Sequence, residues 1–128
     1  MEEIEMNTTT ERSKEQAQAQ IESIVEIVAA LDGSDDDDAE EAIREDALSV
    51  QVRSGWHTPS EFAKAEEYEI LLCTGGPAVR IIGELNDYQE PETCTVQHQD
   101  WFTPWTELVI TKVEEEAVLK YARCFYFS

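Results

Sequence analysis

The stretch from Tyr68 to Asn86, YEILLCTGGPAVRIIGELN, constrains the fold more than any other part of the chain. Two apolar runs, residues 70–73 and 79–82, flank the turn-forming sequence Thr-Gly-Gly-Pro at residues 74–77. Because glycine supplies the positive φ that tight turns demand, this pattern predicts an antiparallel β-hairpin. A two-stranded ribbon is at best marginally stable alone, so other strands or a helix must cover its apolar face.

The segments around the hairpin predict the rest of a sheet. Residues 47–54 and 94–99 alternate apolar and polar side chains, which is typical of half-buried strands. Residues 106–111 predict a further short strand, and residues 113–123 predict a closing helix. We therefore expect an α+β fold, with an antiparallel sheet of about four strands packed against N-terminal helices and a C-terminal helix.

The N-terminal third is predicted to be helical and acidic. Residues 1–10 form a flexible acidic lead-in, and apolar residues recur at helical spacing over residues 11–31. A second helix is expected from about Asp36 to Asp46. The apolar stripe of the first helix fits either the core or a partner, and we predict the core. All 128 residues are expected to form one domain, with an acidic helical part (11–46) and a sheet with its C-terminal helix (47–128).

Charge limits the classes of partner. The chain has 29 acidic and 9 basic residues, a net charge of −20, and 16 of the acidic residues lie within residues 1–46. Such a chain repels nucleic acid and anionic membranes and steers toward basic surfaces. Its basic residues are dispersed, which disfavours direct nucleic-acid binding. No apolar run approaches the ~20 residues of a membrane span. The N-terminus is acidic where a secretory signal is basic, so we predict a cytoplasmic location.

Cysteine and histidine patterns do not indicate a reaction centre. Cys73, Cys94 and Cys124 are odd in number and form no C-x-x-C pair, which favours free thiols. His57 and His98 match no zinc spacing. The run of four aspartates lacks the alternate ligands of a calcium loop. We predict no catalytic residue, metal or cofactor. The alternative is a small hydrolase that uses one of these cysteines or histidines.

The acidic helical surface is the first candidate for partner binding. Carboxylates spaced along a helix can present a charge density comparable with that of a nucleic acid. The competing explanation is that acidity serves only solubility, and the composition favours neither. The candidate residues on this surface are Asp35, Asp36, Asp37, Asp38, Glu40, Glu41 and Glu45.

The motif Trp-x-Thr-Pro occurs twice, at residues 56–59 and 101–104, each time after a predicted strand. Proline ends a strand and fixes the exit of the chain, and the neighbouring tryptophan can cap the core. We predict core capping. The alternative is a shared aromatic surface, since tryptophan is enriched at interface hot spots. Trp56, Trp101 and Trp105 are therefore secondary candidates for partner contact.

Three segments carry a resemblance. LSVQVRSGWHTP (48–59), residues 68–86 and QDWFTPWTE (99–107) resemble blocks in small acidic proteins carried by phages and prophages. Phage proteins of this size and charge resemble inhibitors of host defence, including anti-CRISPR and anti-restriction proteins. The resemblance implies no catalytic residues.

Taken with the charge, the resemblance predicts a non-enzymatic inhibitor that mimics nucleic acid and blocks target DNA binding. Its expected partner is a basic nucleic-acid-binding protein or a CRISPR effector complex of the host, with a type I effector favoured. The protein is expected to be a monomer or homodimer. The alternative from another class is a phage structural or regulatory adaptor that binds a protein through its Trp-rich surface.

Overall fold

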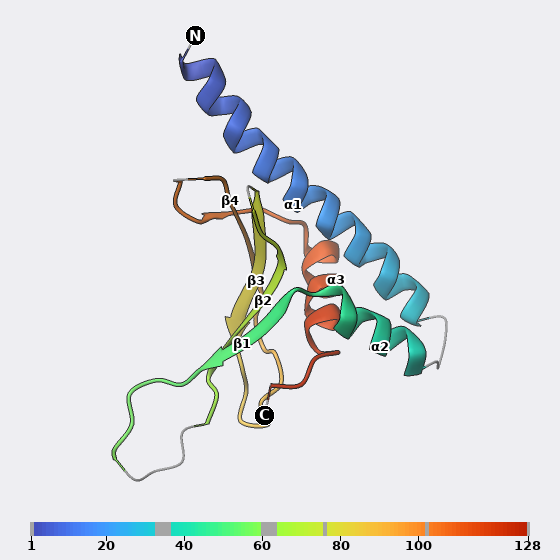
Figure 1. The fold of residues 1–128 in the computed structure, drawn as a ribbon. Helices are drawn as coiled ribbons and strands as arrows, with labels where there is room; N and C mark the ends of the chain where they lie inside the picture. The colour runs from blue at the N-terminus through green and yellow to red at the C-terminus, as the bar shows by residue number, and fades with distance from the viewer. Residues whose placement is uncertain (1, 33–36, 60–63, 76, 102, 128) are drawn as a thin grey trace.

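The computed structural model describes residues 2–32, 37–59, 64–75, 77–101 and 103–127, with the backbone alone for residues 2–11, 32 and 37–39. These residues form a five-stranded antiparallel sheet with strand order β1-β2-β3-β4-β5, and three helices (Figure 1). The α+β prediction is confirmed, with five strands in place of about four. The elements in chain order are α1 (Glu2–Asp32), α2 (Asp37–Asp46), β1 (Ser49–Arg53), β2 (Glu67–Cys73), β3 (Ala78–Glu84), β4 (Thr95–Gln99), β5 (Thr106–Glu107) and α3 (Lys112–Ala122).

The predicted hairpin lies at the centre of the sheet. Strands β2 and β3 pair antiparallel, with Ile70 opposite Ile81, and the register shifts between Leu71 and Cys73. Gly75 in the connecting turn has a φ of 114°, a value that side chains other than glycine rarely adopt. The Gly-rich turn is therefore a consequence of backbone geometry, although Gly76 lies outside the described residues.

The helices cover one face of the sheet and leave the other open (Figure 1). Alternate residues of β2, β3 and β4 are buried beneath the helices, because side chains alternate between the two faces of a strand. The apolar stripe of α1 supplies core residues, as the sequence predicted. The core side chains that are almost fully buried include Ile21, Ile24, Ile70, Ile81, Val96, Val118 and Tyr121.

The first helix is longer than the sequence predicted. It begins at Glu2 rather than near residue 11, so residues 2–10, predicted as a lead-in, continue the helix. This segment contains neither glycine nor proline, the two residues that most disfavour a helix interior. The N-terminal part of α1 projects beyond the edge of the sheet (Figure 1).

The first strand is exposed on both faces, whereas the alternation in its sequence predicted a half-buried strand. All five residues of β1 are exposed. The reason is its position: β1 is an edge strand that pairs with β2 alone, at the margin of the helix layer. Apolar alternation identified the strand correctly, but it did not show whether a helix covers it.

The segment after β4 also differs from prediction. The predicted strand over residues 106–111 is only two residues long, because Thr111 already serves as the N-cap of α3. The α3 boundaries match the predicted closing helix within one residue. Beyond α3, Phe125 and Phe127 are buried, and the Phe127 ring centre lies 5.1 Å from that of Tyr68. The tail is packed against the core without forming a strand in the part that the structure describes.

Candidate functional site

The inner face of α2 is fixed to the C-terminal part of the chain. Ile43 is buried in the core. The Arg44 guanidinium donates to the Cys124 carbonyl over 3.2 Å and lies 5.1 Å from the centre of the Tyr126 ring. The Tyr121 hydroxyl donates to the Asp46 carboxylate over 3.0 Å. These contacts hold α2 in one orientation about its axis. The same face of the helix therefore always points toward solvent.

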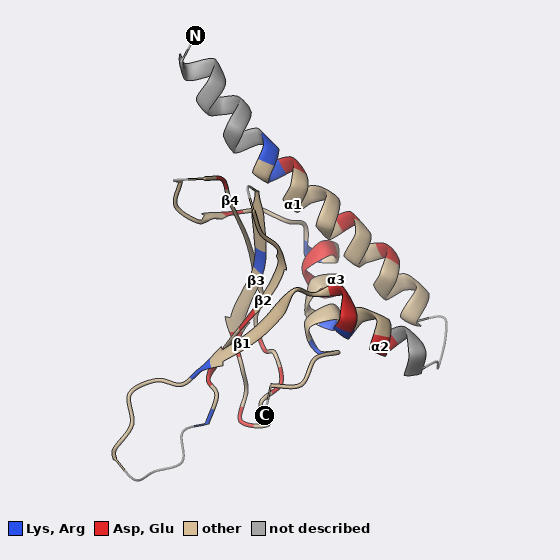
Figure 2. Cartoon of the chain, viewed as in Figure 1, with Lys and Arg blue, Asp and Glu red and all other residues tan. Residues whose placement is uncertain are grey.

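The outer face of α2 is acidic. Glu40, Glu41 and Glu45 are all exposed, and acidic residues are prominent on the helix layer in Figure 2. The Glu40 carboxylate lies 3.9 Å from the guanidinium of Arg44, the residue one turn further on. A half-exposed pair of this kind contributes little and leaves the carboxylate open to a partner. The sequence-predicted site is therefore partly assembled on α2.

The four aspartates before and at the start of α2 add no described side chain to this acidic face. Asp37 and Asp38 begin α2, and their side chains lie outside the described part of the structure. Asp35 and Asp36 lie outside the described residues altogether. The acidic site consequently rests on the three glutamates of α2.

The three tryptophans do not form one surface. Trp56 follows β1, whose end pairs with Glu67, whereas Trp101 and Trp105 follow β4, whose end pairs with Ala78 at the opposite end of the sheet. Trp56 is fully exposed and Trp101 is 66% exposed, so the core-capping interpretation is wrong for both.

Trp105 takes part in a polar cluster on the open face of the sheet. The Arg80 guanidinium lies 4.1 Å from the centre of a Trp105 ring. It also donates to Glu69 over 2.6 Å and to Gln97 over 2.8 Å. Arg80 thus has a carboxylate, an amide and an aromatic face as partners, which compensates its partial burial. This residue was among the dispersed cations in the sequence, and only the strand register places it beside its partners.

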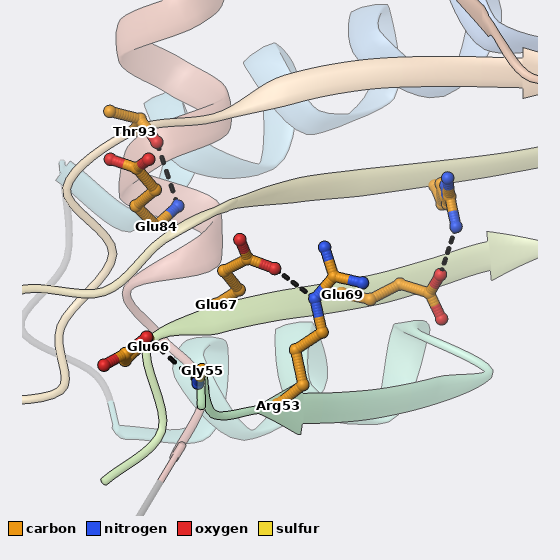
Figure 3. A network of polar contacts seen from close by, with 8 residues as sticks. Arg53, Gly55, Glu66, Glu67, Glu69, Glu84 and Thr93 are labelled. Carbon is orange, nitrogen blue, oxygen red and sulfur yellow. Dashed lines mark hydrogen bonds and ion pairs between the residues drawn. The ribbon is translucent and has the colours of Figure 1, made fainter. Parts of the chain in front are cut away.

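A hollow of about 430 Å³ lies on the same open face. Arg53 pairs with Glu67 at one side, and Gly55 donates its backbone N–H to Glu66 over 3.0 Å (Figure 3). Arg53 and Arg80, which both line the hollow, are engaged with glutamates of the adjacent strand β2. This arrangement stabilises strand pairing, which cross-strand ion pairs commonly do.

A buried polar cluster joins α1 to β4. Ser13 Oγ and His98 Nδ1 lie 2.8 Å apart and share a hydrogen bond, and both residues are almost fully buried. Asp100 is 5% exposed, and its Oδ2 has no hydrogen-bond partner among the described residues. Burial lowers the pKa of His98, and Lys14 acts in the same direction while Asp100 opposes it. The imidazole is therefore held neutral near neutral pH.

These three residue types also occur in acyl-transfer triads, but the geometry here differs. In a triad the nucleophilic hydroxyl bonds Nε2, and the carboxylate holds Nδ1. In this protein the serine bonds Nδ1 and is only 1% exposed. A substrate carbonyl has no route to that hydroxyl, so the cluster serves to fasten the helix to the sheet.

The three cysteines are free and half-buried. Burial raises the pKa of Cys94 to about 11, and the neighbouring Glu115 carboxylate adds to the shift. Burial likewise raises the pKa of Cys73 and of Cys124. A raised pKa lowers the fraction of thiolate at neutral pH and with it the nucleophilic reactivity.

Metal-binding clusters and membrane-spanning helices are both absent from the described part of the chain. No group of three or more His, Cys, Asp or Glu side chains among these residues is placed to hold a metal ion. None of the described helices is both long enough and apolar enough to cross a membrane.

The fold and surface define a small acidic α+β protein with helices on one face of an antiparallel sheet. Comparisons of the chain with family models, with curated proteins and with solved structures gave no match. Its function must therefore be argued from its own surface.

Proposed function

We propose that this protein is a phage-encoded, non-enzymatic inhibitor of a host defence nucleoprotein complex. It acts in the host bacterial cytoplasm and occupies the basic groove that normally holds nucleic acid, so target DNA binding is blocked. A type I CRISPR effector is the first candidate for the complex. The acidic face of α2 supplies the charge that imitates phosphate.

The observation that carries the proposal is the α2 face itself. Glu40, Glu41 and Glu45 are exposed on a helix whose opposite side is anchored through the core and the C-terminal tail. They span five helical steps, about 7.5 Å of axis. Duplex DNA carries about four charges over that length. The anchored helix thus carries three carboxylates over this length, of which one lies beside the Arg44 guanidinium, and the remaining charge is about half that of the duplex.

The charge and the sequence resemblance support the same class. A net charge of −20 steers the protein toward a cationic groove and away from nucleic acid itself. The three segments that resemble phage proteins fall within residues 48–107, which include the sheet behind the acidic helix. The target is the part of the proposal that needs direct measurement.

The decisive experiment is competition with target DNA for a purified type I CRISPR effector complex. The wild-type protein should displace the DNA. The variant E40K/E41K/E45K should lose at least about tenfold in apparent affinity, since it places like charges against a basic groove, which costs several kcal/mol at an interface. Its fold should persist, because all three side chains are exposed.

The matched control is D87K/E90K/E92K, which makes the same change in net charge on the exposed loop between β3 and β4. This control should compete nearly as well as wild type. If both triple variants weaken binding equally, only the net charge matters and the α2 site is rejected. If the wild type does not compete with DNA at low salt, the effector assignment is wrong.

A second candidate function is supported by Trp56. It is fully exposed on the loop after β1, and tryptophan is enriched among the residues that dominate binding at interfaces. A phage structural or regulatory adaptor would bind through this residue with little dependence on salt. W56A would then abolish binding that E40K/E41K/E45K leaves intact, which is the reverse of the result expected for the mimic.

A further inference from the structure

The edge strand β1 has the features of a strand-pairing site. Its five residues pair with β2 without any register shift, from Ser49 opposite Leu71 to Arg53 opposite Glu67. The other edge of the sheet, β5, has only two residues. An edge strand presents alternate backbone N–H and C=O groups away from its neighbour, and proteins usually protect long edges. Among the described strands, β1 is the edge long enough to accept another strand.

The apolar side chains of β1 extend the apolar face of the sheet past the part that the helices cover. Val50 lies opposite Ile70 and Val52 lies opposite Tyr68, and both partners are buried. Directly opposed residues of antiparallel strands share one face of the sheet. Val50 is nonetheless 37% exposed, Val52 46% and the adjacent Leu48 59%. The apolar face of the sheet thus ends in exposed side chains at β1.

The charges around β1 determine which strand can add there. The acidic helix α2 leads directly into β1, and Glu66 and Glu67 lie at its far end beside Arg53 (Figure 3). A second copy of a chain with a net charge of −20 would bring like charges together along this edge. A cationic strand would be attracted, and its alternate apolar residues would extend the exposed row of Leu48, Val50 and Val52.

We propose that β1 binds an extended, basic segment of a partner protein by strand addition, with apolar residues at alternate positions against Val50 and Val52. Main-chain hydrogen bonds supply affinity in such complexes, and the alternate side chains supply specificity. The positive charge of this segment follows from the acidic residues around β1 and agrees with the cationic partner of the proposed function. Strand addition at β1 adds a second contact beside the acidic face of α2.

The probe is a synthetic eight-residue peptide that alternates lysine and valine, with capped ends. Its control is the same design with glutamate in place of lysine. Both are titrated into the ¹⁵N-labelled full chain, with amide shifts and hydrogen exchange as the readout. The basic peptide should perturb residues 49–53 and slow their amide exchange, and the acidic peptide should leave them unchanged.

The test variant is V50K/V52K, which opposes the basic peptide and removes the apolar contacts at exposed positions. It should weaken peptide binding by at least about tenfold, as loss of central apolar contacts does at other interfaces. The matched control is V109K/V113K, where the two valines are 91% and 70% exposed. That control adds the same charge away from β1 and should bind within about twofold of wild type.

Several outcomes would overturn the proposal. These are exchange protection on α2 without protection of residues 49–53, unchanged peptide binding by V50K/V52K, and self-association of the chain through β1.

The triple variant E40K/E41K/E45K separates the two proposals. If it loses DNA competition while V50K/V52K binds the peptide normally, the edge site fails and the α2 mimic stands. If the basic peptide protects β1 while the wild type fails to compete with DNA, the edge site stands and the mimic fails.

Discussion

At the scale of single residues, burial of His98 makes the stability of the fold depend on pH. This side chain is buried against Ser13, and its pKa is lowered mainly by burial. The unfolded chain therefore binds a proton more readily than the folded chain. This contribution to stability is fully present above the unfolded pKa of about 6.5 and is lost as the pH falls toward the folded value.

We expect the free energy of unfolding, measured with urea, to fall more steeply between pH 7.5 and 5.5 in wild type than in H98Q. Equal slopes for wild type and H98Q would show that the imidazole is accessible to protons in the folded state.

Gly83 is a second residue whose identity is set by one physical constraint, the lack of space for a Cβ atom. A Cβ at this position would lie 2.0 Å from the Thr93 carbonyl oxygen and 2.8 Å from a Tyr68 ring carbon. The Tyr68 hydroxyl also donates to the same carbonyl over 2.7 Å, which keeps the two segments close. The glycine is therefore needed for the close approach of the loop after β3.

G83A should lower the free energy of unfolding by at least about 2 kcal/mol, because the clash involves backbone that cannot move aside. G55A is the matched control. Its added Cβ meets only the Glu66 side chain, at 2.5 Å from Oε2, and that flexible end can shift. A loss in G83A no larger than in G55A would mean that the loop after β3 relaxes freely. Urea titration of both variants measures the difference.

At the scale of elements, the N-terminus of α3 is held by two reciprocal hydrogen bonds, and a single substitution can test what they contribute to stability. Thr111 accepts from the Glu114 backbone N–H over 3.2 Å, and the Glu114 carboxylate accepts from the Thr111 N–H over 2.8 Å. This reciprocal capping box fixes the point where the chain leaves β5 and enters the helix.

T111A should lower the free energy of unfolding by about 1 kcal/mol, the usual loss for an N-cap threonine. T58A, at an exposed loop position, should change it by less than about 0.5 kcal/mol. Thermal or urea unfolding of the two variants is sufficient to compare them. Should T111A unfold like wild type, α3 is held by its packing against α1 alone.

The positions of most helices and strands could be predicted from the sequence. The burial and the neighbours of their side chains could not. Apolar spacing located α3 and the β2–β3 hairpin, because period and turn chemistry are local properties. The exposure of β1, the separation of Trp56 from Trp101, and the stacking of Arg80 on Trp105 all depend on strand order. Strand order is set by long-range pairing, which local spacing does not encode.

The residues of the candidate site were likewise predictable only in part. The glutamates of α2 were found from charge alone, since a solvated acidic face is visible in the sequence. The Ser13–His98 pair was missed, because its members are 85 residues apart. A usable signal existed, since His98 shares its strand face with Val96 by period two and therefore points into the core.

At the scale of the whole molecule, the net charge of −20 opposes folding and favours binding to a cationic partner. Repulsion among the carboxylates is stronger in the compact state than in the unfolded chain. The Debye length falls from about 10 Å at 0.1 M salt to about 3 Å at 1 M. Salt should therefore have opposite effects on the two equilibria, which makes it a test of the charge argument.

We expect the melting temperature to rise between 0.1 M and 1 M sodium chloride, by about 4 °C for each kcal/mol of repulsion that salt relieves in a chain of 128 residues. Over the same range, binding to a basic nucleic-acid groove should weaken steeply, since both surfaces carry exposed charges. The variant E40K/E41K/E45K should show a shallower salt slope in binding than D87K/E90K/E92K, because only the former removes charges that the proposed function places against the groove. Binding that is independent of salt would instead indicate an apolar interface centred on Trp56.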